Sequence, residues 1–333
     1  MDQDRKTAAD SAHQESAQPV GTELLRAIVG PTASGKTALA IAICQALAKQ
    51  QPSISGEVVS LDSMLVYRGM DIGTAKPSFD ERCGVPHHLI DIAEPTERYD
   101  VSRYLQEAES AEADIRSRGA LPIFAGGTSF YLKALLAGLF KGPDVDPELR
   151  ARLEARYDEE GAEASHQALV AVDPEIGARV HANDKKRVVR GLEVFEQTGT
   201  ALGELQREWA REPRPSRLVG LEVDVEGLDG RILSRTKTMF AKGWPEEAES
   251  IRASGGFGKT SVQALGYRDV LRFVDGEWTR EEAIAEIALR TRQFSRRQRT
   301  WLRGFEGIRW FPAPKTKEDL LALTPEVLDW ILG

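Results

Sequence analysis

The chain has 333 residues, of which 41% are hydrophobic and 29% are charged, so it can bury the core of one large domain or of a domain with a smaller insertion. No apolar run approaches the roughly eighteen residues of a membrane span, and Cys44 and Cys83 have no metal-ligand neighbours, which predicts a soluble, cytoplasmic protein with reduced thiols. The net charge of −8 would argue against a nucleic-acid partner if the charge were evenly spread, yet residues 290–303 hold six arginines and no acid.

The N-terminal part of the chain predicts alternating strands and helices. Residues 1–22 lack the apolar run of a secretion signal and are expected to form a disordered tail. Residues 24–29 form an apolar run before a glycine-rich turn, and 37–47 continue with helical spacing, which indicates strand, turn and helix. Another helix is expected from Val101, where Asp100 is suited to cap the first turn, to a stop at Gly119. Further strands are expected at 57–61, 88–92 and 121–127, and a further helix at 130–139.

The rest of the chain changes character twice. Residues 147–209 are rich in alanine, glutamate and arginine without a convincing strand, which predicts an inserted all-helical domain over 146–212. Strands are expected again at 217–223 and 308–311. Strands that alternate with helices specify an α/β fold with a parallel sheet flanked by helices. Its two parts are expected to be 23–145 and 213–333.

The turn after the first strand matches a phosphate-binding loop, G-x-x-x-x-G-K-[ST], at every fixed position. The glycines let successive N–H groups point inward, the lysine adds a cation, and the helix N-terminus contributes a favourable dipole. The final threonine can ligate magnesium. The sheet is therefore expected to be P-loop NTPase-like, and the loop to hold a phosphorylated ligand, with Mg²⁺ at Thr37, through Gly30, Pro31, Thr32, Ala33, Ser34, Gly35, Lys36 and Thr37.

Polar segments also follow two other predicted strands, as LDS at 61–63 and GGTS at 126–129. Ligands of parallel sheets bind at the carboxyl ends of the strands, so we expect both segments to converge with the loop on one crevice. Asp62 could hold magnesium there, which makes a kinase or hydrolase the first hypothesis from spacing alone. Asp62 could equally cap a turn.

Six segments in a fixed order change that interpretation. Over roughly residues 24–312 the chain closely resembles the bacterial tRNA dimethylallyltransferase family, also called tRNA isopentenyltransferases. The segments are GPTASGKTALA (30–40), DSMLVYRGMDIGTAKP (62–77), GVPHHLIDI (84–92), AGGTSFYLKALLAGL (125–139), QALGYRD (263–269) and TRQFSRRQRTWLRG (291–304).

The resemblance implies transfer of a prenyl group from dimethylallyl diphosphate to the exocyclic amine of the adenosine 3′-adjacent to the anticodon, in tRNAs that read codons beginning with U, with release of diphosphate. The loop then holds the leaving group, and a C–O bond is broken rather than a P–O bond. The resemblance assigns Asp62 as general base and Thr128 as a hydroxyl near the bridging oxygen. Lys36 then stabilises the leaving group, and Arg150 lies near the transferred group and tRNA.

The resemblance also explains two basic stretches, 290–303 and NDKKRVVR at 183–190, because members grip the anticodon stem-loop between core and insertion and turn the target base out of its stack. A monomer is expected. Leu65 stands where glutamine is frequent, so one polar contact to RNA could be absent. The implied tRNA-binding residues are Asp62, Ser63, Met64, Leu65, Thr128, Arg150, Lys186, Arg187, Val188, Val189, Arg190, Gln263, Ala264, Leu265, Gly266, Tyr267, Arg268, Arg296, Arg297, Gln298, Arg299, Thr300, Trp301, Leu302 and Arg303.

Three rival functions stay open at this point. They are a P-loop small-molecule kinase, an adenylate prenyltransferase that acts on free nucleotide, and a P-loop protein that binds RNA without catalysis. His87 and His88 invite a metal or acid–base interpretation, but packing beside the core is favoured because no second ligand cluster is visible.

Overall fold

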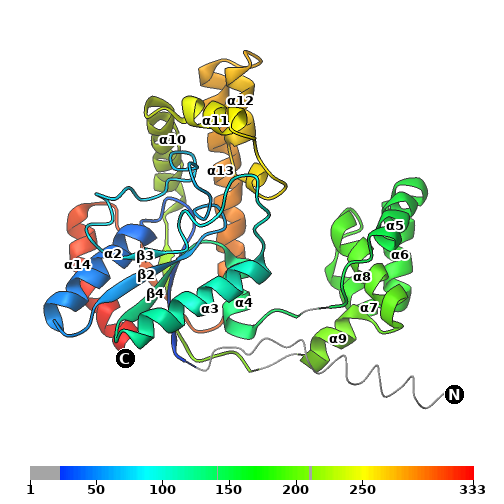
Figure 1. Ribbon diagram of the computed structural model, residues 1–333, viewed down its shortest axis with the longest axis horizontal. Coiled ribbons are helices and arrows are strands. Elements are labelled where there is room, and N and C mark those ends of the chain that lie inside the picture. Colours follow the sequence, from blue (N-terminus) through cyan, green and yellow to red (C-terminus); the bar gives the residue numbers. More distant parts are fainter. Residues whose placement is uncertain (1–22, 141, 210–211) are drawn as a thin grey trace. The chain divides into compact units, whose positions relative to one another are not determined.

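The computed structural model describes residues 23–140, 142–209 and 212–333, and the chain divides into two compact units (Figure 1). One unit combines Gly21–Leu136 with Arg214–Gly333, and Ala137–Pro213 belong to the other. The predicted tail over 1–22 lies outside the described residues. Within those residues, no helix is both long enough and apolar enough to cross a membrane.

A parallel six-stranded sheet forms the centre of the first unit (Figure 1). Its strands are β1 (Leu25–Val29), β2 (Gly56–Leu61), β3 (His87–His88), β4 (Leu121–Gly126), β5 (Ser216–Glu222) and β6 (Ile308–Pro312). They lie in the order β3-β2-β4-β1-β5-β6, and all their pairings are parallel. β1, β2 and β4 are almost entirely buried, as expected of apolar strands covered on both faces. The predicted fold class is confirmed.

Helices cover both faces of this sheet. α2 (Lys36–Gln50) and α14 (Lys317–Leu332) share a core with strand residues that include Ile28 and Val219. α3 (Val101–Ser117) and α4 (Ser129–Ala137) are joined by the stacked rings of Tyr104 and Tyr131, 4.0 Å apart, and the Tyr104 hydroxyl donates to a carbonyl of β2. Asp100 caps α3, as predicted, by accepting two backbone N–H groups.

A third group of helices belongs to the same unit. It comprises α10 (Val225–Ala241), α11 (Trp244–Ala253), the short η1 (Ser261–Gln263), α12 (Tyr267–Val274) and α13 (Arg280–Leu302), which stand together beside the sheet (Figure 1). α10 packs along α13, and a capping box at Thr279 and Glu282 fixes the start of α13. This arrangement brings the arginine-rich helix close to the strands that carry the phosphate loop.

The second unit is helical throughout its described part. It contains α5 (Pro147–Glu160), α6 (Ala162–Val172), α7 (Pro174–Arg179), α8 (Lys185–Thr198) and α9 (Leu202–Trp209), packed around Leu153, Leu169, Val188 and Leu192. Asp146, Asp173 and Asp184 accept backbone N–H groups at the starts of α5, α7 and α8.

One predicted strand is wrong. Residues 88–92 were expected to be extended, but β3 ends at His88. Leu89 and Asp91 have φ angles of 58°, in the left-handed region that a strand does not adopt. The chain therefore turns, and the backbone of Asp91 and Ile92 instead donates to the carbonyls of Leu65 and Val66.

Candidate active site

A pocket of about 770 Å³ opens where the segments after β1, β2 and β4 meet α10 and α13, all within the first unit. β4 lies between β1 and β2, so the carboxyl ends of these strands are neighbours at one edge of the sheet. Thr32, Lys36, Asp62 and Thr128 all line the pocket. The polar segments thus converge on one crevice, as the sequence predicted.

The loop after β1 has the shape of an anion cradle. Ala33 and Gly35 have positive φ angles of 61° and 84°, which turn the chain sharply before α2 begins. No side chain caps the N-terminus of α2 within the described parts of the chain, and no acid lies in its first turn. Its first N–H groups and the positive end of its dipole therefore face the pocket unopposed.

Lys36 adds a cation at this cradle. Its Nζ donates to the Pro31 carbonyl at 3.1 Å. The pKa of Lys36 is lowered to about 8, mainly by burial and also by the like charge of Arg235, while Asp62 acts in the opposite direction. Burial disfavours the charged form of this lysine, so an anion bound beside it would stabilise the ammonium group. The cradle is therefore suited to a phosphorylated ligand.

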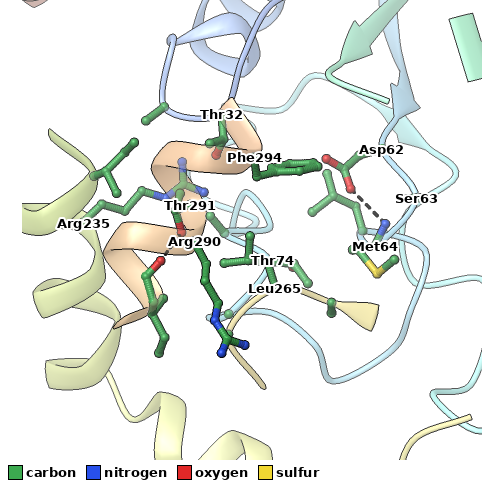
Figure 2. A pocket seen from close by; sticks show the side chains of 18 of the residues that line it. Thr32, Asp62, Ser63, Met64, Thr74, Arg235, Leu265, Arg290, Thr291 and Phe294 are labelled. Atoms are coloured by element: carbon green, nitrogen blue, oxygen red, sulfur yellow. Dashed lines mark hydrogen bonds between the residues drawn. The ribbon is translucent and has the colours of Figure 1, made fainter. Parts of the chain in front are cut away.

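Asp62 and Thr128 lie together because β2 and β4 run side by side. The Asp62 carboxylate accepts the Met64 N–H at 2.9 Å, and the Thr128 hydroxyl accepts the Ser63 N–H at 3.2 Å. Asp62 therefore caps a turn, and it still lines the pocket (Figure 2). The two roles that the sequence left open for it are both compatible with this geometry.

Gly126 makes this close approach of β4 and β2 possible. A Cβ at position 126 would lie 1.9 Å from the Leu61 carbonyl oxygen, a backbone atom that cannot move aside as a side chain could. Only glycine fits there, and the Thr128 N–H then donates to the same Leu61 carbonyl at 3.2 Å.

We expect Gly126→Ala to lower the free energy of unfolding by about 1–3 kcal/mol or more, because the strands must separate to admit the methyl group. Chemical denaturation measures this change. The matched control is Gly230→Ala in α10, where an added Cβ meets nothing within 4 Å and helix propensity favours alanine by about 0.5–1 kcal/mol. Equal stabilities of the two variants would contradict the packing account.

Arg235 is a pocket residue that the sequence analysis missed. It extends from α10 into the pocket (Figure 2) and forms no ion pair within the described ranges of the chain. Burial lowers its pKa, and Asp62 partly opposes that shift. No motif marks this arginine. Its position on the helix that follows β5 could have indicated a place near the phosphate loop, because β5 is the neighbour of β1 in the sheet.

Apolar side chains form one part of the remaining wall, beside polar ones that include Thr74, Arg290 and Thr291. Met64 and Leu65 follow Asp62, and Leu265 and Phe294 line the same pocket from η1–α12 and α13. Figure 2 shows Phe294 and Asp62 pointing toward one another, and the Phe294 residue is 39% exposed. The pocket therefore joins an anion cradle to a carboxylate and to a hydrophobic surface, which suits a ligand with a phosphorylated end and a hydrocarbon end.

Several implied tRNA-binding residues are not accessible as side chains. Val188 and Val189 lie in the core of the helical unit, Leu302 is 1% exposed on α13, and Tyr267 is 1% exposed with its hydroxyl donating to Glu247. These side chains pack in the protein interior, so the predicted side-chain contacts to tRNA are limited to exposed residues of the same stretches. Exposed members of the predicted stretches include Lys186, Arg187, Gln263, Arg268, Arg296, Arg297, Thr300, Trp301 and Arg303.

The helical unit holds Arg150 and the 186–190 stretch. Arg150 pairs with the buried carboxylate of Glu193, and Arg190 reaches the same carboxylate at 2.8 Å. Arg187 pairs with Asp184 at 3.1 Å. The role that the resemblance gives Arg150 toward the transferred group stays a prediction.

The two histidines have packing partners. His88 contacts the Glu57 carboxylate at 2.6 Å, and His87 contacts the Val85 carbonyl at 2.8 Å. Among residues 23–140, 142–209 and 212–333, no three His, Cys, Asp or Glu side chains group in a way that could hold a metal.

The fold and this pocket define the chain as a P-loop enzyme whose phosphate cradle opens into a pocket with a carboxylate and an apolar patch on its wall. Comparison with known proteins identifies the family: the IPP transferase family matches residues 65–305, and the chain belongs to it. It is a transferase of the tRNA dimethylallyltransferase kind.

Relatives and solved structures agree with this assignment. The tRNA dimethylallyltransferase of Methylococcus capsulatus is 43% identical over 85% of this chain and 90% of its own length, and that of Anaeromyxobacter dehalogenans is 43% identical over 88% and 96%. The tRNA isopentenylpyrophosphate transferase of Bacillus halodurans superposes with a TM-score of 0.66 at 35% identity, over 93% of this chain and 97% of its own. A eukaryotic dimethylallyltransferase solved acting on tRNA gives a TM-score of 0.76 at 27% identity, over 92% and 78%.

Proposed function

We propose that this protein transfers a dimethylallyl group from dimethylallyl diphosphate to the exocyclic amine of the adenosine next to the anticodon, on its 3′ side, in tRNAs that read codons beginning with U. Diphosphate is the second product. The observation that carries the proposal is that one pocket joins the phosphate cradle, the Asp62 carboxylate and an apolar wall. The names of the relatives and the family membership support it.

In this reaction the amine nitrogen attacks the allylic carbon, and the bond from that carbon to the bridging oxygen breaks. An adenine amine is a weak nucleophile, so it must be oriented and must lose a proton as it attacks. Asp62 is placed to accept that proton, and the Thr128 hydroxyl lies beside it. The electron pair leaves with the diphosphate, whose growing negative charge meets Lys36, Arg235 and the N–H groups of the cradle.

We further propose that Mg²⁺ accompanies the diphosphate at Thr37, where it would neutralise charge on the leaving group. Thr37 lines the pocket, and its hydroxyl has no hydrogen-bond partner among the described residues. The other ligands would be diphosphate oxygens and water, since no cluster of three acids, histidines or cysteines serves a metal in the described ranges. Hard oxygen ligands of this kind are those that Mg²⁺ prefers.

The test incubates the protein with Mg²⁺, dimethylallyl diphosphate and unmodified tRNA, and measures released diphosphate together with the mass of the tRNA. Parallel reactions offer ATP or free AMP. A tRNA that gains one dimethylallyl group for each diphosphate released supports the proposal. ATP turnover without tRNA modification would replace it with a kinase, prenylated AMP with a nucleotide prenyltransferase, and bound but unaltered tRNA with an RNA-binding protein.

We expect Arg297→Ala to reduce the steepness of the salt dependence of tRNA binding by about one unit, because each phosphate contact releases roughly one counterion. Arg297 is exposed on α13 and forms no ion pair in the described portion of the chain. Binding titrations over a series of salt concentrations measure the slope. Lys49→Ala, which removes an exposed cation from the end of α2, is the control and should leave the slope unchanged. An unchanged slope for Arg297→Ala would assign that side chain to the solvated surface.

A further inference from the structure

Gln298 was implied as a tRNA contact, but its side chain lies inside the protein. It is 8% exposed and projects from α13 between two loops of the active site. Its Oε1 accepts the Thr32 N–H of the phosphate loop at 2.9 Å, and its Nε2 donates to the Gly127 carbonyl, after β4, at 2.9 Å. One side-chain amide thus joins both loops through a matched acceptor and donor.

The bond to Thr32 also acts on Lys36. The Thr32 N–H and the Pro31 C=O belong to one planar peptide unit, so fixing one fixes the other. That Pro31 carbonyl accepts Lys36 Nζ at 3.1 Å and the Ser34 N–H at 3.3 Å. Gln298 therefore holds the peptide plane that orients the lysine of the cradle.

The bond to Gly127 acts on the other side of the pocket. Gly127 directly precedes Thr128, whose hydroxyl receives the Ser63 N–H next to Asp62. A Cβ at position 127 would lie 2.5 Å from Gln298 Nε2 and 3.0 Å from the Gly30 carbonyl, so the three chain segments meet without spare room.

We propose that Gln298 is a positioning residue for the transfer reaction proposed above: it fixes the register between the phosphate loop and the Thr128–Asp62 pair. It does so through the backbone groups of Thr32 and Gly127, which occupy both ends of its side-chain amide. Without it, the Thr32 N–H and the buried Gly127 carbonyl lose their partner, and the two loops are free to shift against one another.

The first test compares steady-state kinetics of the wild type with Gln298→Met, a variant of similar shape that can make neither bond, and with Gln298→Leu should the methionine variant not fold. We expect kcat to fall on the order of a hundredfold, as for a small misplacement of reacting groups, while the Kd for tRNA stays unchanged. Ile284→Val, a buried α13 residue outside the pocket, is the control for a loss of stability alone and should keep the wild-type kcat.

A double-mutant cycle with Gly127→Ala tests the contact itself. The added methyl group should displace the Gln298 amide, so the effects of Gly127→Ala and Gln298→Met on kcat should be clearly less than additive. Additive effects, or a Gln298→Met enzyme with kcat within threefold of the wild type, would reduce Gln298 to a structural residue.

A binding measurement separates this proposal from the proposed function. Calorimetry with inorganic diphosphate and Mg²⁺, in the absence of RNA, should show about tenfold weaker binding for Gln298→Met and none of this loss for Ile284→Val. If the wild type modifies no tRNA but shows this difference, the proposed function fails and the positioning role stands. Equal diphosphate affinity of wild type and Gln298→Met would overturn the positioning role.

Discussion

Asp62→Ala is expected to lower turnover by roughly 10²–10⁴-fold, the loss typical of removing a general base, and to leave tRNA affinity nearly unchanged. The carboxylate lines the pocket beside the cradle, where an adenine amine that attacks the allylic carbon would have to lose its proton. Single-turnover kinetics with tRNA in excess of its Kd measure the chemical step apart from binding.

The informative control is Asp62→Asn. The Asp62 carboxylate also accepts the Met64 N–H at 2.9 Å, and an asparagine oxygen can keep that bond while being unable to take up a proton. Both variants should therefore be slow. An asparagine enzyme with near-normal turnover would show that Asp62 only shapes the turn and would remove it from the mechanism.

Arg235→Met is expected to lower kcat by about 10²–10³-fold, the range found for the loss of one preorganised donor to developing negative charge. Arg235 reaches into the pocket from α10, where its charge and that of Lys36 act on one another and on Asp62 (Figure 2). Rates of diphosphate release under saturating donor and tRNA measure the effect.

The same variant should not destabilise the unliganded protein. Burial lowers the pKa of Arg235 and outweighs the opposing attraction of Asp62, and the like charge of Arg235 also lowers the pKa of Lys36, so its removal relieves a net unfavourable burial of charge. Lys237→Met, which removes an exposed charge from the same helix, is the matched control and should keep wild-type kcat. If the Arg235→Met enzyme is as fast as Lys237→Met, Arg235 does not stabilise the leaving group and other groups must do so.

Much of the fold could be predicted from local pattern. The buried strands read as apolar runs, and Asp100 and the glycine-rich loop mark the starts of their helices. Parallel strands bring their carboxyl ends to one edge, so the positions of Asp62 and Thr128 beside the loop could be predicted from the sequence. The strand expected at 88–92 failed because the positive φ angles of Leu89 and Asp91 arise from the packing of that turn and leave no mark in the residue types.

The rest of the site depends on contacts between distant segments. Arg235 and Gln298 are separated from the phosphate loop by about two hundred residues or more, and neither is marked by a recognisable spacing. Gln298 lies among arginines, and this basic stretch suggested that Gln298 contacts RNA. Its side-chain amide instead joins two loops of the protein. Helical periodicity could have corrected part of the tRNA list, because Val188 and Val189 belong to the apolar face of α8.

The central claim is that the cradle releases a diphosphate from carbon. It is tested most directly with dimethylallyl diphosphate that carries ¹⁸O in the bridging position, incubated with the protein, Mg²⁺ and unmodified tRNA. Mass spectrometry of the released phosphate species then locates the label. Cleavage of the C–O bond predicts ¹⁸O in the diphosphate and prenylated tRNA without the label. Unlabelled phosphate, with ¹⁸O retained on the five-carbon product, would mean that phosphorus is attacked, and would contradict the account.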